Sequence, residues 1–199
     1  MKSIFLFALL FSTSLFADNT STGTNALLNN TTGTKNVAIG DSSLKSNTTG
    51  LNNTSVGYFG LRNNTTGKQN TGIGSYSLRY NTEGDDNTAV GFESLKYNTT
   101  GNKNTAIGNY SLQDNTTGDS NTSIGNYTLS DNTTGDKNTA VGNYSMRSNS
   151  SGNDNTSMGN YAMRDNTSGS DNTASGNYAL RYNTTGSNNT ALGNQSMKA

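Results

Sequence analysis

One phrase of 17 residues is repeated ten times between Asn30 and Ala199, and it fills most of this 199-residue chain. With positions in each repeat numbered as columns 1–17, the consensus is N-T-T-G-x-x-N-T-A-[IV]-G-N-Y-S-[LM]-[RK]-x. Asn at columns 1 and 7 and Gly at columns 4 and 11 never vary. A short fixed period is typical of a solenoid, in which each repeat forms one coil and packs only on its neighbours.

The composition is too polar for one large hydrophobic core, because apolar residues make up only 29% of the chain. Such a composition also suits a disordered chain, but a thin solenoid needs only one or two apolar columns. A helical repeat is disfavoured, because Gly, Asn and Thr are poor helix formers and the apolar spacing follows no helical face. The sequence therefore predicts an all-β fold, a parallel β-solenoid (β-roll) of ten 17-residue coils stacked through ladders of identical Asn side chains.

Two short strands are expected in each coil, one over columns 7–11 and one over columns 12–16. Alternate residues of a strand share a face, so columns 8 and 10 should face one way and columns 9 and 11 the other. Tyr at column 13 is expected on the same face as column 15. Columns 10 and 15, which are aliphatic, are predicted to form the core ladder: Ile39, Val56, Ile73, Val90, Ile107, Ile124, Val141, Met158 and Leu192, with Leu44, Leu61, Leu78, Leu95, Leu112, Leu129, Met146, Met163, Leu180 and Met197.

Ser175 is the one polar residue at column 10. If that column faces the core, Ser175 buries a hydroxyl, and Ser175→Ile should stabilise the rod. The N-T-T-G run at columns 1–4 is expected to turn the chain into the next coil. The turn glycines are Gly33, Gly50, Gly67, Gly84, Gly101, Gly118, Gly135, Gly152, Gly169 and Gly186, placed where a Cβ would collide with neighbouring backbone.

The N-terminal residues 1–17 differ from the repeats. Lys2, an apolar run and a small residue at Ala17 are typical of a bacterial secretory signal peptide. Residues 18–29 are expected to form a partial repeat or cap, and residues 30–199 the ten-repeat solenoid. The mature protein is therefore expected to be secreted or held at the cell surface, with no membrane span.

Catalysis is not expected, because a chain without His or Cys lacks the usual nucleophile–base pairs. No cofactor or metal is expected either: the acidic residues around Glu83, Asp85 and Asp86 do not follow a calcium-loop pattern and indicate a solvated turn. No nucleic-acid partner is expected, because 13 basic residues are balanced by 13 acidic ones and nothing in the overall charge points to one.

One stripe of the repeat combines aromatic and basic residues, at columns 13 and 16. The candidate binding face consists of Tyr110, Tyr127, Tyr144, Tyr161 and Tyr178, with Arg147, Arg164 and Arg181. Such a face could hold an anionic glycan or another polyanion through charge, stacking and cation–π contacts. The alternative is structural: the charges keep rods apart and the rings stack for stability.

The runs Asn104-Thr-Ala-Ile-Gly108 and Asn138-Thr-Ala-Val-Gly142 resemble the head repeats of trimeric autotransporter adhesins, although the adhesin period is usually shorter. They are also similar to repeats of phage-type tail fibres. The resemblance implies a left-handed parallel β-roll, three of which meet along an axis through Ala and Gly of columns 9 and 11. It also implies a homo-oligomer, with a trimer favoured, and a host-surface, matrix or glycan target.

Three functions therefore compete for this sequence. The first is an exported, non-enzymatic structural or adhesive protein, adhesin-head-like or fibre-forming. The second is an ice-binding solenoid that orders water on ladders of Thr, which is frequent at columns 2, 3 and 8. The third is a fragment of a phage-type tail fibre.

Overall fold

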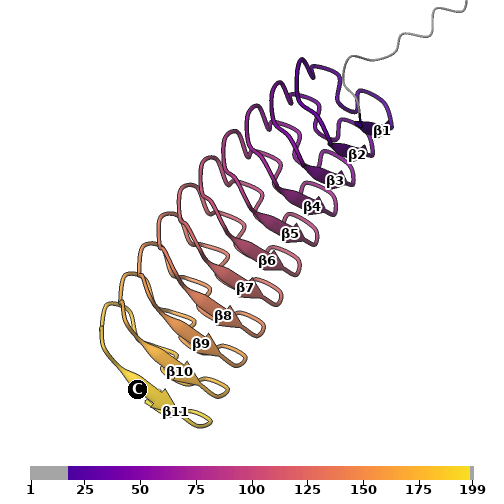
Figure 1. The fold of residues 1–199 in the computed structure, drawn as a ribbon. Helices are drawn as coiled ribbons and strands as arrows, with labels where there is room; N and C mark the ends of the chain where they lie inside the picture. The colour runs from indigo at the N-terminus through magenta and orange to yellow at the C-terminus, as the bar shows by residue number, and fades with distance from the viewer. Residues whose placement is uncertain (1–17, 198–199) are drawn as a thin grey trace, which may run out of the picture.

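The computed structural model describes residues 18–197 and shows an elongated stack of coils (Figure 1). This confirms the predicted fold class, an all-β parallel β-solenoid with about ten coils of 17 residues. The predicted signal peptide at residues 1–17 lies outside the described residues. Between residues 18 and 197, no helix is long and apolar enough to cross a membrane.

Each coil contributes one strand of three residues, at columns 8–10, to a single 11-stranded parallel sheet. The strands are β1 (Thr20–Thr22), β2 (Val37–Ile39), β3 (Thr54–Val56), β4 (Thr71–Ile73), β5 (Thr88–Val90), β6 (Thr105–Ile107), β7 (Thr122–Ile124), β8 (Thr139–Val141), β9 (Thr156–Met158), β10 (Thr173–Ser175) and β11 (Thr190–Leu192). Neighbours in the sheet are neighbours in the chain, and Thr105 of β6 pairs with Thr122 of β7. Identical columns therefore lie directly above one another.

The second predicted strand, over columns 12–16, is wrong. Residues at columns 13 and 15 adopt left-handed backbone angles, as in Tyr110 with φ 58° and Leu112 with φ 52°. Left-handed residues bend the chain sharply, so an extended strand cannot continue through them. The expected common face of these two columns is lost as well: Leu112 is fully buried, whereas Tyr110 is half-buried.

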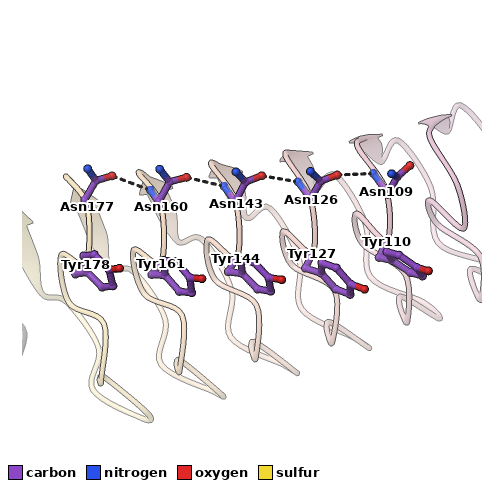
Figure 2. A pocket seen from close by; sticks show the side chains of 10 residues that line it. All are labelled: Asn109, Tyr110, Asn126, Tyr127, Asn143, Tyr144, Asn160, Tyr161, Asn177 and Tyr178. Carbon is purple, nitrogen blue, oxygen red and sulfur yellow. Dashed lines mark hydrogen bonds between the residues drawn. The ribbon is translucent and has the colours of Figure 1, made fainter.

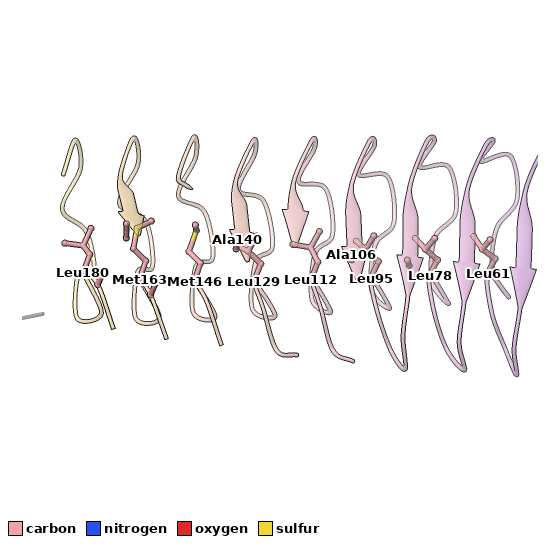
Figure 3. Close-up of a cluster of buried hydrophobic side chains, with 14 of the residues drawn as sticks. Leu61, Leu78, Leu95, Ala106, Leu112, Leu129, Ala140, Met146, Met163 and Leu180 are labelled. Atoms are coloured by element: carbon pink, nitrogen blue, oxygen red, sulfur yellow. The ribbon is translucent and has the colours of Figure 1, made fainter. Parts of the chain in front are cut away.

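The core lies between columns 9 and 15, not between columns 10 and 15. The leucines and methionines of column 15 are buried from Leu44 to Leu180, as predicted, whereas Met197 in the last coil is exposed. Figure 3 shows this row running along the rod with alanines of column 9 beside it. One large side chain fills the interior of a coil, so only a small residue such as Ala106 fits opposite.

Column 10 points outward, which contradicts the core ladder predicted for it. Ile39, Ile73, Ile107, Ile124, Val141, Met158 and Leu192 are exposed, and Val56, Val90 and Ser175 are half-buried. Each strand therefore alternates as predicted, but with the two faces reversed. Ser175 does not bury a hydroxyl in the core, so the expected gain in stability from Ser175→Ile through core filling is wrong as well.

The Asn columns form hydrogen-bonded ladders inside the rod, as predicted. At column 1, Asn64 Nδ2 donates to Asn47 Oδ1 at 2.8 Å; at column 7, Asn53 Nδ2 donates to Asn36 Oδ1 at 3.2 Å. Both ladders also meet at one acceptor, since Asn64 and Asn53 donate to the carbonyl of Gly67 at 2.9 and 2.8 Å. Buried amides paired in this way tie successive coils together.

Glycine is required at the two invariant columns, 4 and 11, for different physical reasons. At column 4, a Cβ on Gly118 would lie 2.5 Å from the carbonyl of Gly135 and 2.5 Å from Asn115 Oδ1. At column 11, Gly108 has φ 129°, a conformation that side chains rarely adopt. Close contact between coils therefore fixes column 4, and backbone conformation together with close contact fixes column 11.

Candidate binding surfaces

The sheet face, defined by the outward side chains of columns 8 and 10, runs the length of the rod. In β6 these are Thr105, half-buried, and Ile107, 40% exposed. The same pair recurs on the neighbouring strands because the register is fixed. The outward residues of column 10 are aliphatic from Ile39 to Met158 and are exposed or half-buried. A row of apolar surface of this kind is a candidate interaction surface.

The predicted trimer interface, Ala and Gly of columns 9 and 11, is wrong for column 9. Ala106 is fully buried within its own coil, so it cannot contact a second chain. Gly108 packs against Gly125 of the next coil. Any contact across the sheet must be made by columns 8 and 10.

The tyrosines of column 13 form a second ladder, seen in Figure 2. Tyr127, Tyr144, Tyr161 and Tyr178 stack in sequence with ring centroids 5.1–5.3 Å apart and interplanar angles of 1–6°. Tyr110 continues the stack at 4.6 Å. Because the rings cover one another's faces, they present mainly edges and hydroxyls to solvent.

Beside the tyrosines runs a row of exposed asparagines from column 12, above the rings in Figure 2. The backbone N–H of Asn126 donates to Asn143 Oδ1, and that of Asn143 to Asn160 Oδ1, each at 3.1 Å. The two rows border the Asn–Tyr groove, of about 670 Å³. Its lining residues are Asn109, Tyr110, Asn126, Tyr127, Asn143, Tyr144, Asn160, Tyr161, Asn177 and Tyr178.

Only some of the basic residues of the candidate face lie close to the tyrosine rings. The Arg181 guanidinium carbon lies 5.2 Å from the Tyr178 ring centroid, and that of Arg147 lies 5.8 Å from Tyr144. Arg164 instead pairs with Asp165, its Nε 2.6 Å from Oδ1. These cations lie beside the ring stack but do not line the Asn–Tyr groove.

The acidic residues of column 5 have a structural role that sequence reasoning missed. Asp119 Oδ1 accepts the backbone N–H of Asn102 at 2.6 Å, and Asp136 Oδ1 accepts that of Asp119 at 2.7 Å. The signal in the sequence was the run of Asp, Asn and Ser that fills column 5 from Asp85 to Ser187, since all three residue types carry a short side-chain acceptor. Among residues 18–197, no group of three or more His, Cys, Asp or Glu side chains could hold a metal ion.

Comparison with known proteins adds no identification. No protein-family model, no curated protein and no solved structure matches this chain. The fold is therefore established by the structure, as a parallel β-solenoid with Asn and Ser ladders. The similarity to adhesin heads is carried by the repeat motif alone.

Proposed function

We propose that this protein is an exported, non-enzymatic structural or adhesive rod, similar to an adhesin head, that associates with copies of itself through the sheet face. The observation that carries the proposal is the exposed aliphatic column 10, of which Ile107 and Ile124 are 40% and 39% exposed. Burying apolar surface stabilises an assembly by about 25 cal/mol per Å². A row that continues from coil to coil adds this contribution at every level.

The fixed register suits parallel association of identical rods. When two copies lie side by side in the same direction, the Thr105–Ile107 pair of one copy meets the same pair of the other. The corresponding pairs of all the remaining coils meet in the same way. Closed rotational symmetry is the usual arrangement of such assemblies. The resemblance to adhesin heads favours three copies around the axis.

The test is the molar mass of the purified protein, measured by light scattering and sedimentation equilibrium. We expect a trimer, and we expect Ile107→Lys to shift it toward monomer, because a charge at the centre of an apolar interface is costly to bury. Gln69→Lys is the matched control, since Gln69 is exposed and lies outside the strands, and its column already holds Lys at positions 35, 103 and 137. A monomer at every concentration would overturn the association.

Export is supported by the predicted signal peptide. Its test is N-terminal sequencing of the protein recovered outside bacterial cells, for which we expect a start near Asp18. A chain that stays inside the cell with Met1 intact would contradict export. The adhesive role is tested separately, by binding of the purified rod to host cells, matrix proteins and glycan arrays.

A second function, ice binding, is favoured by one feature of the same face. Thr105 and Ile107 both point outward, so Thr and aliphatic side chains form a regular array repeated once per coil. Thermal hysteresis and ice recrystallisation assays test this directly. Activity that is lost in Ile107→Lys while the molar mass stays monomeric would favour ice binding, because a face buried in an oligomer cannot contact ice.

A further inference from the structure

We propose that the Asn–Tyr groove binds a single strand of a neutral, extended, β-linked polysaccharide, with about one sugar unit per coil. This inference names a ligand for the proposed adhesive role. It does not depend on self-association, because the Asn–Tyr groove is built from columns 12 and 13, which follow the strands and take no part in the sheet face.

One wall of the groove is a row of amide donors. The Oδ1 of Asn143 is occupied, since it accepts the backbone N–H of Asn126 at 3.1 Å. That bond orients the side chain and leaves Nδ2 without an acceptor among the described residues. The neighbouring coils repeat this arrangement at Asn126 and Asn160. The Asn edge of the groove therefore presents one oriented N–H₂ group per coil, suited to a ligand with regularly spaced hydroxyl acceptors.

The opposite wall is a row of phenol hydroxyls and ring edges. Tyr127, Tyr144 and Tyr161 have φ of 53°, 56° and 57°, where Gly or Asn would be accommodated more easily. Column 13 has the same conformation where it holds Ser42 or Glu93, so the backbone does not require Tyr there. The recurrence of Tyr in five successive coils therefore indicates a role for the side chain itself. Each hydroxyl both donates and accepts, as sugar hydroxyls do.

The uncharged lining of the groove favours a neutral ligand over a polyanion. Asn and Tyr are its only lining residues within the described chain, and Arg147 and Arg181 lie beside the ring stack rather than in the groove. A polyanion would find no cation in the groove to neutralise it. A neutral, hydroxyl-rich chain matches both walls.

The spacing of the groove separates a polysaccharide from a peptide. Successive rings from Tyr127 to Tyr178 are 5.1–5.3 Å apart, which is close to the advance of one sugar in an extended β-linked glucan. An extended peptide advances by about 3.3 Å per residue, so its groups would fall out of step with the coils. The Asn-Tyr sequence at columns 12 and 13 recurs in five successive coils and is replaced by Phe92-Glu93 in the coil before them and by Asn194-Gln195 in the coil after them. At one sugar per coil, the groove therefore holds about five sugars.

The experiment is titration of the purified full chain with cellohexaose and chitohexaose, followed by calorimetry and by tyrosine fluorescence. The chain has no Trp, and five of its ten Tyr line the groove, so fluorescence reports on the site. Maltohexaose has the same sugars as cellohexaose but a curved chain. We expect at least one of the two extended oligosaccharides to bind and maltohexaose not to bind.

Two variants place the binding in the groove. Asn143→Asp keeps an oxygen for the Asn126 N–H but removes the outward donor, and should weaken binding roughly tenfold. Tyr97→Ala is the control, because Tyr97 belongs to a separate stacked pair with Tyr80 outside the groove, and should leave binding unchanged. Failure of both extended oligosaccharides to bind, equal binding of maltohexaose, or full binding by Asn143→Asp would overturn the proposal. Such a failure with the trimer intact would leave the self-association proposal standing.

Discussion

Ala106 and Ile107 are neighbours on β6, yet Ala106 is fully buried whereas Ile107 is 40% exposed. The smaller and less hydrophobic residue occupies the interior because Leu112 already fills it. The larger residue faces outward, where it is available to another molecule. Side-chain size therefore decides which strand residues face the interior of the rod. The larger hydrophobic side chains that do not fit there lie on its surface.

The first prediction tests this reversal of faces. Ala106→Leu should destabilise the rod by about 1–3 kcal/mol or more, because the packed interior has no room for three further carbon atoms. Ile107→Ser should change the free energy of unfolding of the single rod by only about 0.5 kcal/mol. Urea unfolding at protein concentrations below self-association measures both. If Ile107→Ser is the more damaging variant, the outward assignment of column 10 is wrong.

The 17-residue period was enough to predict the solenoid, because stacking in register is the way a short repeat buries its polar ladders. The faces of the strand were predicted wrongly because hydrophobicity was weighed without size. The sequence did contain a usable signal. Column 9 never holds a side chain larger than Ala or Ser, as at Ala38 and Ser55, whereas column 10 accepts both Met158 and Ser175. A column limited by volume faces inward, and a column tolerant of size and polarity faces outward.

The second strand could not have been excluded from composition. Tyr and Leu do not normally adopt left-handed angles, as Tyr110 and Leu112 do here. Residue propensities therefore do not predict the bends at columns 13 and 15. The Asn–Tyr groove depends on those bends. Its residues were visible as a repeated Gly-Asn-Tyr run, but their common exposure followed only from the structure.

The second prediction concerns the column 7 ladder. Asn121 Nδ2 donates to Asn104 Oδ1 and to the carbonyl of Gly135, and its Oδ1 accepts from Asn138. Asn121→Ala leaves several buried groups unpaired at about 1–3 kcal/mol each, so we expect a loss of a few kcal/mol in thermal or urea melts. Asn126→Ala is the control: that side chain is exposed and should cost less than half as much. Equal losses would show that the buried ladder has no special weight.

The third prediction separates glycines that are needed from one that is replaceable. Gly118→Ala places a Cβ 2.5 Å from the Gly135 carbonyl, so the coils must move apart and the melting temperature should fall by several degrees. Gly72→Ala is the matched change at column 9, where other coils have Ala. Its Cβ meets the Ser77 hydroxyl at 3.0 Å, and a hydroxyl can rotate away. We therefore expect Gly72→Ala to stabilise the rod by about 0.5–1 kcal/mol.

The last prediction follows from Asp114, at column 17. Burial raises the pKa of Asp114, and the negative charge of Asp131 on the next coil raises it further. The folded chain therefore binds this proton more tightly than the unfolded chain does, so ionised Asp114 opposes folding at pH values above its raised pKa. That cost disappears as the pH falls through the raised pKa and below the ordinary value of 3.8.

Asp114→Asn should accordingly raise the melting temperature at about pH 7 and leave it nearly unchanged at about pH 3, where the carboxyl is protonated in both states. Thermal melts of the two proteins across this range measure the difference. In an Asp131→Asn background the gain at neutral pH should shrink, because one cause of the raised pKa has been removed. If Asp114→Asn lowers the melting temperature at neutral pH, or raises it equally at both pH values, Asp114 is not a destabilising charge in the folded rod.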